Sequence, residues 1–294
     1  MPKRQPKQQT PQIDLSFVNA ATLLLPPADQ WHFLLIGCGG TGSWLAPSIA
    51  RLCRVLGEQG KSAEAIFIDH DRLEQKNIPR QNFCEAELGQ PKASALAARY
   101  SAAWGVKITA RVEPFKQAHL REYEWRNQNL ILIGAVDNAA ARQEIAKSLK
   151  GNTADVPHTA WWLDCGNSES SGQVILGSAP DAKELRGAFL SRKICRALPA
   201  PTLVAPDLLE PRPEESRKNK ISCAEIQMAN NQSLAVNQAV AAIASDYLSR
   251  LVSGGLKKFA TYFDLESGSA RSRYIVPEEI AGMAKKPVEF VLAK

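Results

Sequence analysis

Two kinds of segment are missing from this chain of 294 residues. No apolar run approaches the ~18 residues needed to cross a bilayer, which argues against a membrane protein. The first ten residues are polar, basic and rich in proline and glutamine, so they lack the apolar segment of a secretory signal. We therefore expect a cytoplasmic protein without a membrane partner.

Paired cysteines are missing as well. The six cysteines are scattered and no two form a C-x-x-C pair, which argues against a four-cysteine zinc site and a disulfide framework. We expect most of the thiols to be reduced and several to be small residues of the core. The sequence also has no G-x-x-x-x-G-K-[ST] segment, which excludes a P-loop nucleotide site.

Acidic residues are outnumbered by basic ones, and the formal net charge is +6. Part of the excess lies in the first ten residues and part in residues 212–220. Such segments are either solvated or contact an acidic partner such as nucleic acid. Because no aromatic residues are interleaved with the basic ones and no DNA-reading motif occurs, we favour solvated segments and keep nucleic acid as the alternative.

Residues 33–43 contain the most informative feature of the chain. Large apolar residues lead into four glycines within six positions, namely Gly37, Gly39, Gly40 and Gly42. Apolar residues then return at helical spacing, so the pattern predicts a buried strand, a tight turn and a helix. Glycine lets the backbone approach a ligand closely, and a helix N-terminus attracts an anion. The stretch therefore predicts a site for the phosphates of a nucleotide.

A second predicted strand, residues 65–69, ends on Asp69. The order strand, glycine turn, helix, strand and acid is typical of the βαβ unit of dinucleotide sites, in which the carboxylate accepts both ribose hydroxyls. A glycine pattern alone is a weak signal, so the prediction of nucleotide binding depends on these flanking features.

Polar side chains that suit phosphate groups follow this strand. Asn77 and Arg80 are three residues apart and would face the same way on one helical turn. An arginine fork and an amide donor suit triphosphate oxygens, although the segment could also be a solvated loop. Lys92 follows Pro91 at the start of another predicted helix, where its ammonium group either reaches phosphates or is simply exposed.

Residues 129–138 predict another buried strand, which ends on Asp137 and Asn138. The carboxyl ends of parallel strands share one edge of a sheet, so Asp69, the glycine turn and Asp137 should converge. Asp137 could hold Mg²⁺ against phosphate oxygens, or it could cap the following helix.

The periodic pattern of the core stops between residues 179 and 222, where proline is frequent. We interpret this stretch as a long mobile insertion. It contains Cys195, whose thiol pKa the neighbouring Lys193 and Arg196 would lower. The alternative is an incidental surface cysteine.

The predicted fold is α/β, a Rossmann-like, mostly parallel sheet with helices on both faces, plus a C-terminal helix and a β-hairpin. The amphipathic spacing of residues 236–251 predicts that helix, and the turn signal at 266–269 predicts the hairpin. We expect an N-terminal tail or arm (1–30), a nucleotide-binding core (31–178), the insertion (179–222) and a C-terminal part that completes the same domain (223–294).

A nicotinamide dehydrogenase needs the glycine turn and the acid that binds the ribose. This sequence has further polar residues that such an enzyme does not need. The additional residues are Asn77, Arg80, Lys92 and Asp137. A cradle of cations with a metal-binding acid suits ATP, because charge on the phosphates must be neutralised while a carboxylate attacks the α-phosphorus and pyrophosphate leaves. These residues therefore indicate adenylyl transfer.

Five motifs follow one another in a fixed order along residues 37–142. They are Gly37-x-Gly39-Gly40-x-Gly42-Ser43, Asp69-x-Asp71, Asn77-x-x-Arg80-Gln81, Gly89-Gln90-Pro91-Lys92 and Asp137-Asn138-x-x-x-Arg142. This order resembles that of the ThiF/MoeB/E1 superfamily of ubiquitin-activating-type adenylyltransferases, over about residues 31–178. Within it, the chain most resembles the ThiF-related family of the PRTRC cassette of bacterial mobile elements.

The resemblance implies a role for each of these residues. The four glycines wrap the nucleotide phosphates, Asp69 holds the ribose and Asp71 supports the site. The triphosphate is bound by Asn77, Arg80 and Lys92, which also stabilise developing charge. Asp137 positions Mg²⁺, and Asn138 lies beside it in the nucleotide site. The implied cofactors are ATP and Mg²⁺.

The resemblance also implies partners. The attacking group would be the C-terminal carboxylate of a small ubiquitin-like (β-grasp) protein, and an E2-like protein could act later. A homodimer is expected, although Arg4 lies too far upstream to match the N-terminal arginine that many relatives place in the partner's site. Cys195 lies where relatives carry their crossover segment, and it is the candidate to take the adenylate onward.

Two other functions stay open. One is activation of a different carboxylate, such as that of a modified tRNA base, which the basic tail would suit. The other is a non-catalytic, nucleotide-bound adaptor, against which the full set of phosphate-side residues argues. A nicotinamide dehydrogenase ranks last.

Overall fold

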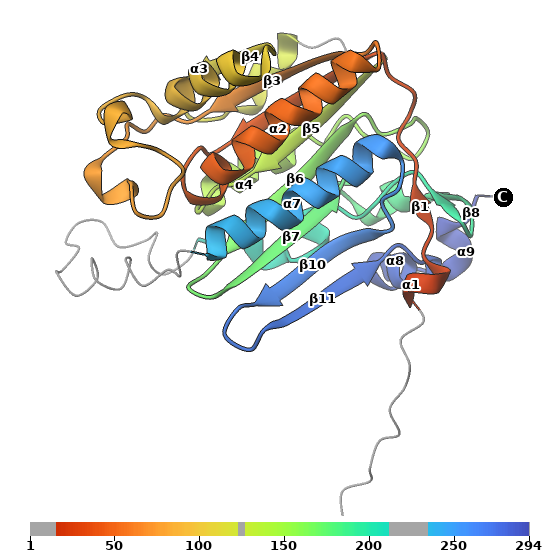
Figure 1. Ribbon diagram of the computed structural model, residues 1–294. Coiled ribbons are helices and arrows are strands. Elements are labelled where there is room, and N and C mark those ends of the chain that lie inside the picture. Colours follow the sequence, from red (N-terminus) through yellow and green to blue (C-terminus); the bar gives the residue numbers. More distant parts are fainter. Residues whose placement is uncertain (1–15, 123–126, 212–234, 294) are drawn as a thin grey trace, which may run out of the picture.

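The computed structural model describes residues 16–122, 127–211 and 235–293 (Figure 1). Its main feature is a sheet of eight strands in the order β11-β10-β7-β6-β5-β2-β3-β4. The parallel strands are β2 (Gln30–Ile36), β3 (Ser62–Ile68), β4 (Ile108–Arg111), β5 (Gln128–Gly134) and β6 (Ala160–Asn167). The antiparallel strands are β7 (Ser171–Gly177), β10 (Lys258–Asp264) and β11 (Ser269–Tyr274). The predicted Rossmann-like, mostly parallel sheet is confirmed.

Helices cover both faces of this sheet. One face carries α2 (Gly40–Glu58), α3 (Lys92–Trp104) and α7 (Val236–Ser253), and α2 and α7 run side by side in Figure 1. The other face carries η3 (Gln117–Glu122), α4 (Ala139–Lys147), α5 (Pro201–Val204) and η5 (Pro206–Leu209). None of the helices in the described ranges is long and apolar enough to cross a membrane.

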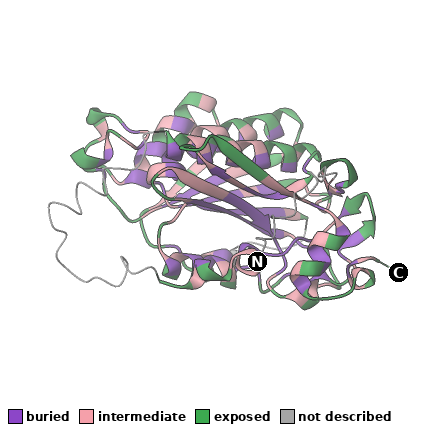
Figure 2. Ribbon diagram, turned by 90° about the horizontal axis from the view of Figure 1, so that it is seen from below, coloured by how far each residue is buried: buried purple, intermediate pink, exposed green. Residues whose placement is uncertain are grey.

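The central strands are apolar throughout because both of their faces are covered. In β2, Phe33 and Leu35 belong to the core under α2 and α7, whereas Leu34 and Ile36 belong to the core on the other face. Successive side chains of a strand point to opposite faces, so a strand buried on both sides needs a continuous apolar run. Figure 2 shows the buried residues gathered along these strands.

The C-terminal part extends the sheet. Helix α7 is capped by Gly254, whose backbone N–H donates to the carbonyl oxygen of Arg250. Its left-handed φ of 74° suits glycine, which has no Cβ to clash. Strand β10 pairs with β7, and β11 pairs with β10, so the predicted helix and hairpin are confirmed. Two short helices that the sequence pattern did not predict follow them, α8 (Pro277–Ala284) and α9 (Val288–Val291).

Residues 179–211 are packed into the fold, so the prediction of a mobile insertion over 179–222 is wrong for this part, while 212–222 lies outside the described residues. The segment forms η4 (Ala182–Leu185), β8 (Phe189–Ser191), β9 (Ile194–Cys195), α5 and η5. Leu185, Phe189 and Leu198 are fully buried. Prolines interrupt the periodicity on which the prediction depended, but short segments between them still bury apolar side chains.

The described part of the predicted N-terminal arm packs against this same segment. It forms α1 (Ser16–Asn19) and β1 (Thr22–Leu23). Strand β1 pairs in parallel with β9, and β9 pairs with β8, so that the three form a small second sheet. The N-terminal arm and residues 179–211 therefore support each other.

Gly177 offers a test of how tightly residues 179–211 pack. A Cβ at this position would collide with the carbonyl oxygen of Pro199 and lie 2.7 Å from the Cα of Ala200. We expect Gly177→Ala to lower the free energy of unfolding by about 1–3 kcal/mol, measured by urea denaturation. The matched control is Gly57→Ala in α2, where a Cβ meets nothing within 4 Å. This substitution should raise the free energy of unfolding by about 0.5–1 kcal/mol, because alanine favours a helix more than glycine does. Equal effects of the two substitutions would contradict tight docking.

Candidate functional site

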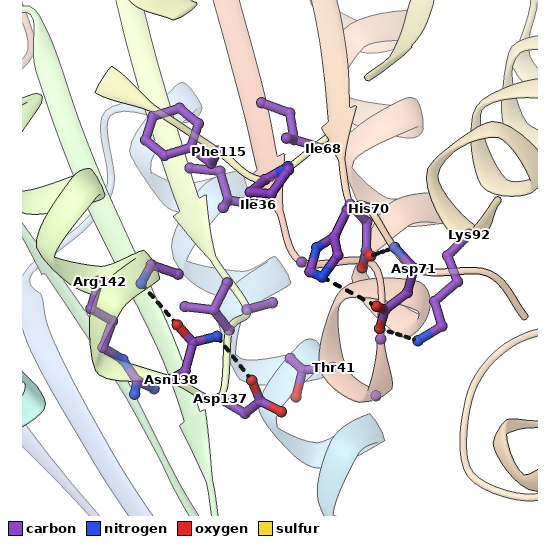
Figure 3. Close-up of a pocket in the computed structure, with 18 of the residues that line it drawn as sticks. Ile36, Thr41, Ile68, His70, Asp71, Lys92, Phe115, Asp137, Asn138 and Arg142 are labelled. Atoms are coloured by element: carbon purple, nitrogen blue, oxygen red, sulfur yellow. Dashed lines mark hydrogen bonds and ion pairs between the residues drawn. The ribbon is translucent and has the colours of Figure 1, made fainter. Parts of the chain in front are cut away.

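A cleft of about 990 Å³ lies where β2, β3, β5 and β6 end. The sequence-predicted residues that line it are Gly37, Gly39, Gly40, Asp69, Asp71, Asn77, Arg80, Lys92, Asp137 and Asn138. Figure 3 shows His70, Asp71 and Lys92 on one side of the cleft and Asp137, Asn138 and Arg142 on the other. The predicted convergence of Asp69, the glycine turn and Asp137 at one sheet edge is therefore confirmed.

Each glycine of the turn has its own structural reason. Gly37 has φ of 90°, and a Cβ there would collide with the carbonyl oxygen of Ala135. A Cβ on Gly42 would collide with the carbonyl oxygen of Gly37, and one on Gly40 would lie 2.5 Å from Oδ1 of Asn237. These three glycines are thus required by packing within the protein, whatever the turn binds.

Gly39 is the glycine of the turn that has room around it. The nearest atom to a Cβ there would be Nε2 of Gln81, at 3.8 Å. Gly39 precedes α2 and provides no side-chain cap, so the first N–H groups of the helix point toward the cleft without such a partner. Together with the positive end of the helix dipole, these N–H groups make a place for an anion.

Asp69 ties the end of β3 to the glycine turn. Its Oδ2 accepts the backbone N–H of Cys38 at 2.6 Å, and its Oδ1 accepts that of Asp71 at 2.8 Å. Burial raises the pKa of the Asp69 carboxyl, and the two backbone donors oppose this rise only in part. Each oxygen keeps acceptor capacity for a further hydroxyl group, so bracing the turn and binding a ribose are compatible.

Lys92 is held by an acid rather than extended into the cleft. Its Nζ lies 2.9 Å from Oδ2 of Asp71, and its side chain is 7% exposed. Burial pushes the pKa of the Asp71 carboxyl upward, but the hydrogen bond and charge of Lys92 outweigh burial, and the pKa of Asp71 is lowered. The pair places one fixed cation in the wall of the cleft.

Arg80 is placed by contacts that the sequence did not reveal. Nε1 of Trp44, in α2, donates to the carbonyl oxygen of Arg80 at 3.3 Å. The backbone N–H of Asn82 donates to Oγ of Ser43 at 2.9 Å, and its side chain donates to the hydroxyl of Tyr100 at 3.0 Å. The segment that carries Arg80 is therefore clamped between α2 and α3.

Asn77 lies at the end of η1 (Gln75–Asn77), at the base of the same segment. Its side chain is buried, and its Oδ1 accepts the backbone N–H of Glu74 at 3.0 Å. Asn77 and Arg80 both line the cleft, as their spacing predicts.

Of the two roles that the sequence left open for Asp137, the structure assigns the capping of α4 to Asn138 instead. Oδ1 of Asn138 accepts the backbone N–H of Ala141 at 2.9 Å, so Asn138 caps α4. Asp137 is exposed at the rim of the cleft and accepts the side-chain N–H of Asn138 at 3.3 Å. Its remaining lone pairs suit the oxygen coordination that Mg²⁺ prefers.

A second acidic group adjoins the cleft. Asp69, His70 and Asp71 offer ligand atoms within 4.8 Å of one another. Both oxygens of Asp69 already accept backbone N–H groups, and Asp71 pairs with Lys92. Asp137 therefore fits a cation better than this group does.

A cluster of buried and half-buried polar side chains joins the glycine turn to distant parts of the chain. Thr41 donates to Oδ1 of Asn237 at 3.3 Å, and Nδ2 of Asn167 donates to the same oxygen at 2.6 Å. All three residues line the cleft. Isolated asparagines in β6 and α7 carry no sequence signal of this contact, because they are 70 residues apart.

Cys195 does not meet the expectation for a reactive thiol. It is fully buried in β9, its Sγ donates to the carbonyl oxygen of Ala197 at 3.1 Å, and it does not line the cleft. Burial raises its pKa to about 12, which outweighs the opposing charge of Arg196. The predicted lowering of this pKa is therefore wrong. Cys165 does line the cleft, but burial raises its pKa as well.

The contact between Gly40 and Asn237 can be tested by a double-mutant cycle. We expect Gly40→Ala to lower the free energy of unfolding by about 1–3 kcal/mol, because the new methyl group displaces a buried, hydrogen-bonded amide. In the double variant Gly40→Ala/Asn237→Ala, part of this loss should be relieved, with a coupling free energy of about 1 kcal/mol measured by urea denaturation. Gly39→Ala is the control without a clash, and additive effects at 40 and 237 would refute the contact.

Solved structures resemble this fold. PaaA aligns with a TM-score of 0.53 and 19% identity over 84% of this chain and 65% of its own. E. coli MccB with ATP aligns with a TM-score of 0.51 and 15% identity, over 83% of this chain and 63% of its own. E. coli MccB with AMPCPP and MccA aligns with a TM-score of 0.51 and 14% identity, over 83% of this chain and 64% of its own. The chain thus spans just under two thirds of the length of these proteins, and the likeness shows the fold alone.

Comparison of the sequence with family models identifies the family of the chain. No curated protein matches the chain. The family model described as the ThiF family matches residues 14–266, which is most of the chain and includes the glycine turn, the cleft and α7. The chain belongs to the ThiF family.

Proposed function

We propose that this chain is an E1-like, ThiF-type adenylyltransferase that uses ATP to adenylate the C-terminal carboxylate of a small ubiquitin-like (β-grasp) protein and releases pyrophosphate. One observation carries the proposal. In a single cleft that Arg80 also lines, the Lys92–Asp71 pair lies on one side and the exposed Asp137 lies on the other (Figure 3). A hydride-transfer site has no use for that distribution of charge.

ATP fits the cleft in a definite way. Its phosphates would lie over the first turn of α2, where the N–H groups and the helix dipole attract anions. Its ribose hydroxyls would reach Asp69. Its base would contact the apolar wall that Ile36, Ile68 and Phe115 form in Figure 3. The volume of about 990 Å³ leaves room for the end of an acceptor beside the nucleotide.

The reaction is a displacement at the α-phosphorus. A carboxylate oxygen of the acceptor forms a bond to this phosphorus, the bond to the oxygen of pyrophosphate breaks, and no proton has to move. Lys92, which Asp71 holds, and Arg80, whose backbone is tied to Trp44, would be the cations that stabilise the charge gathering on the leaving pyrophosphate. Asp137 would hold Mg²⁺, which supplies further neutralisation of phosphate oxygens.

The relatives support ATP more strongly than they identify the acceptor. E. coli MccB has been solved with ATP and also with MccA. For this chain, a ubiquitin-like acceptor, a homodimer and a later E2-like partner are proposals drawn from the motif resemblance. Cys195 is buried away from the cleft, so the proposal assigns it no part in a transfer that follows adenylation.

The site assignment predicts the behaviour of two variants. We expect Arg80→Ala and Asp137→Ala each to lower the rate of pyrophosphate exchange into ATP by about 10²–10³-fold, because each removes stabilisation of phosphate charge. Exchange would be measured with a panel of ubiquitin-like proteins as acceptors. The matched controls are Arg186→Ala and Asp155→Ala, which break an exposed ion pair that does not line the cleft.

The outcomes separate the proposed function from its alternatives. Full exchange in both cleft variants would refute the assigned roles. Exchange stimulated by tRNA instead of by a protein would favour activation of a modified base. Tight ATP binding without exchange with any acceptor would favour a nucleotide-bound adaptor.

A further inference from the structure

Arg142 is a buried arginine in the wall of the cleft that the proposed reaction has not used. It lies in α4, and its side chain is 4% exposed. Its Nε donates to Oδ1 of Asp164, in β6, at 3.0 Å, and Asp164 is completely buried. This contact fixes the plane and direction of the guanidinium group.

The terminal nitrogens of the guanidinium group, Nη1 and Nη2, differ from Nε in their contacts. Within the described ranges, Nε is the only side-chain nitrogen of Arg142 that donates a hydrogen bond. Nη1 and Nη2 are not among the enclosed polar atoms without a partner, so they are not completely enclosed, and Arg142 lines the cleft. A Cβ built on Gly166, in β6, would lie 3.6 Å from Nη2 and 3.3 Å from Cγ of Gln173, so Nη2 adjoins the backbone of β6. Arg142 thus keeps N–H donors that Asp164 does not use, at the wall of the cleft.

Arg142 and Lys92 lie on opposite sides of the cleft (Figure 3). Its partner Asp164 lies in β6, whereas Asp71 and Lys92 lie beyond the end of β3. The strand order β6-β5-β2-β3 places these ends three strand spacings apart, or about 14 Å. The glycine turn follows β2 and lies between the two ends.

This order matches the geometry of the displacement. The attacking and leaving oxygens must lie roughly in line, on opposite sides of the phosphorus. With the α-phosphate over the glycine turn and pyrophosphate directed toward Arg80 and Lys92, the attacking group arrives from the side of β5 and β6. Arg142 is the buried cation on that side.

We propose that the fork of Arg142 binds the attacking carboxylate of the acceptor, with Asp164 orienting the fork. This inference rests on the proposed function, because it deepens the acceptor side of the same site. An arginine fork matches both oxygens of a carboxylate, whereas a lysine offers only a point charge. Arg142 therefore sets the chemical class of the acceptor group and holds it for attack.

Binding can be observed directly by NMR of protein labelled with ¹⁵N-arginine. The probe is glycylglycine, a minimal C-terminal carboxylate, added in the presence of AMPCPP and Mg²⁺ so that no reaction occurs. We expect the guanidinium resonances of Arg142, identified by their loss in Arg142→Lys, to shift on titration. Glycylglycinamide, which lacks the carboxylate, should leave them unchanged.

A variant of Arg142 tests the consequence. Arg142→Lys should weaken glycylglycine binding by at least about tenfold while leaving the affinity for AMPCPP within about twofold. Arg186→Lys, in an exposed ion pair outside the cleft, is the matched control.

Three results would overturn the proposal. They are an Arg142 resonance that does not respond to glycylglycine, an equal response to glycylglycinamide, or a loss of AMPCPP affinity in Arg142→Lys. The first two results come from the wild-type titration, for which Arg142→Lys is needed only as a folded reference that identifies the Arg142 resonances. A carboxylate response without pyrophosphate exchange would instead leave Arg142 supported and count against adenylation, so the two failures are distinguishable.

Discussion

The close contact between the glycine turn and the two strands beside it is the constraint on which the site depends. Gly37 ends β2 against the backbone carbonyl of Ala135, which follows β5. From the other side, the carboxylate of Asp69 holds the backbone N–H of Cys38 at the end of β3. The turn therefore contacts the segments that follow both neighbouring strands, β5 and β3. These contacts fix the N-terminus of α2, which attracts anions, relative to the acids that follow the two strands. Without that fixed relation, the polar residues would not act on a common ligand.

The order of the strands then distributes the chemistry across the cleft. Polar groups at the end of β3 include an acid–lysine pair, the turn after β2 offers backbone N–H groups, and the segment after β5 offers Asp137. Parallel strands bring these groups to one edge because all of their carboxyl ends lie there. The proposed displacement at phosphorus needs a leaving side and an attacking side, which groups at neighbouring strand ends would provide.

Support for this row comes from parts of the chain that are distant in sequence. Asn237 of α7 fills the space beside Gly40, and Asn82 ties the Arg80 segment to α2 and α3. Residues 179–211 close the other end of the molecule with β1 and bury Cys195 there. The thiol is thus a packing residue, and the cations next to it in sequence do not compensate for its burial.

Local patterns in the sequence were enough to establish the sheet, the glycine turn and most of the cleft residues. Apolar runs, glycine spacing and strand-end acids report their structure within a few positions, and the parallel topology then requires them to meet. Tertiary contacts alone decided which glycines serve packing, that Asn138 and not Asp137 caps α4, and that Lys92 is paired with Asp71. They also decided the burial of Cys195 and the pairing of Arg142 with Asp164, because burial and hydrogen-bond partners depend on residues far away along the chain.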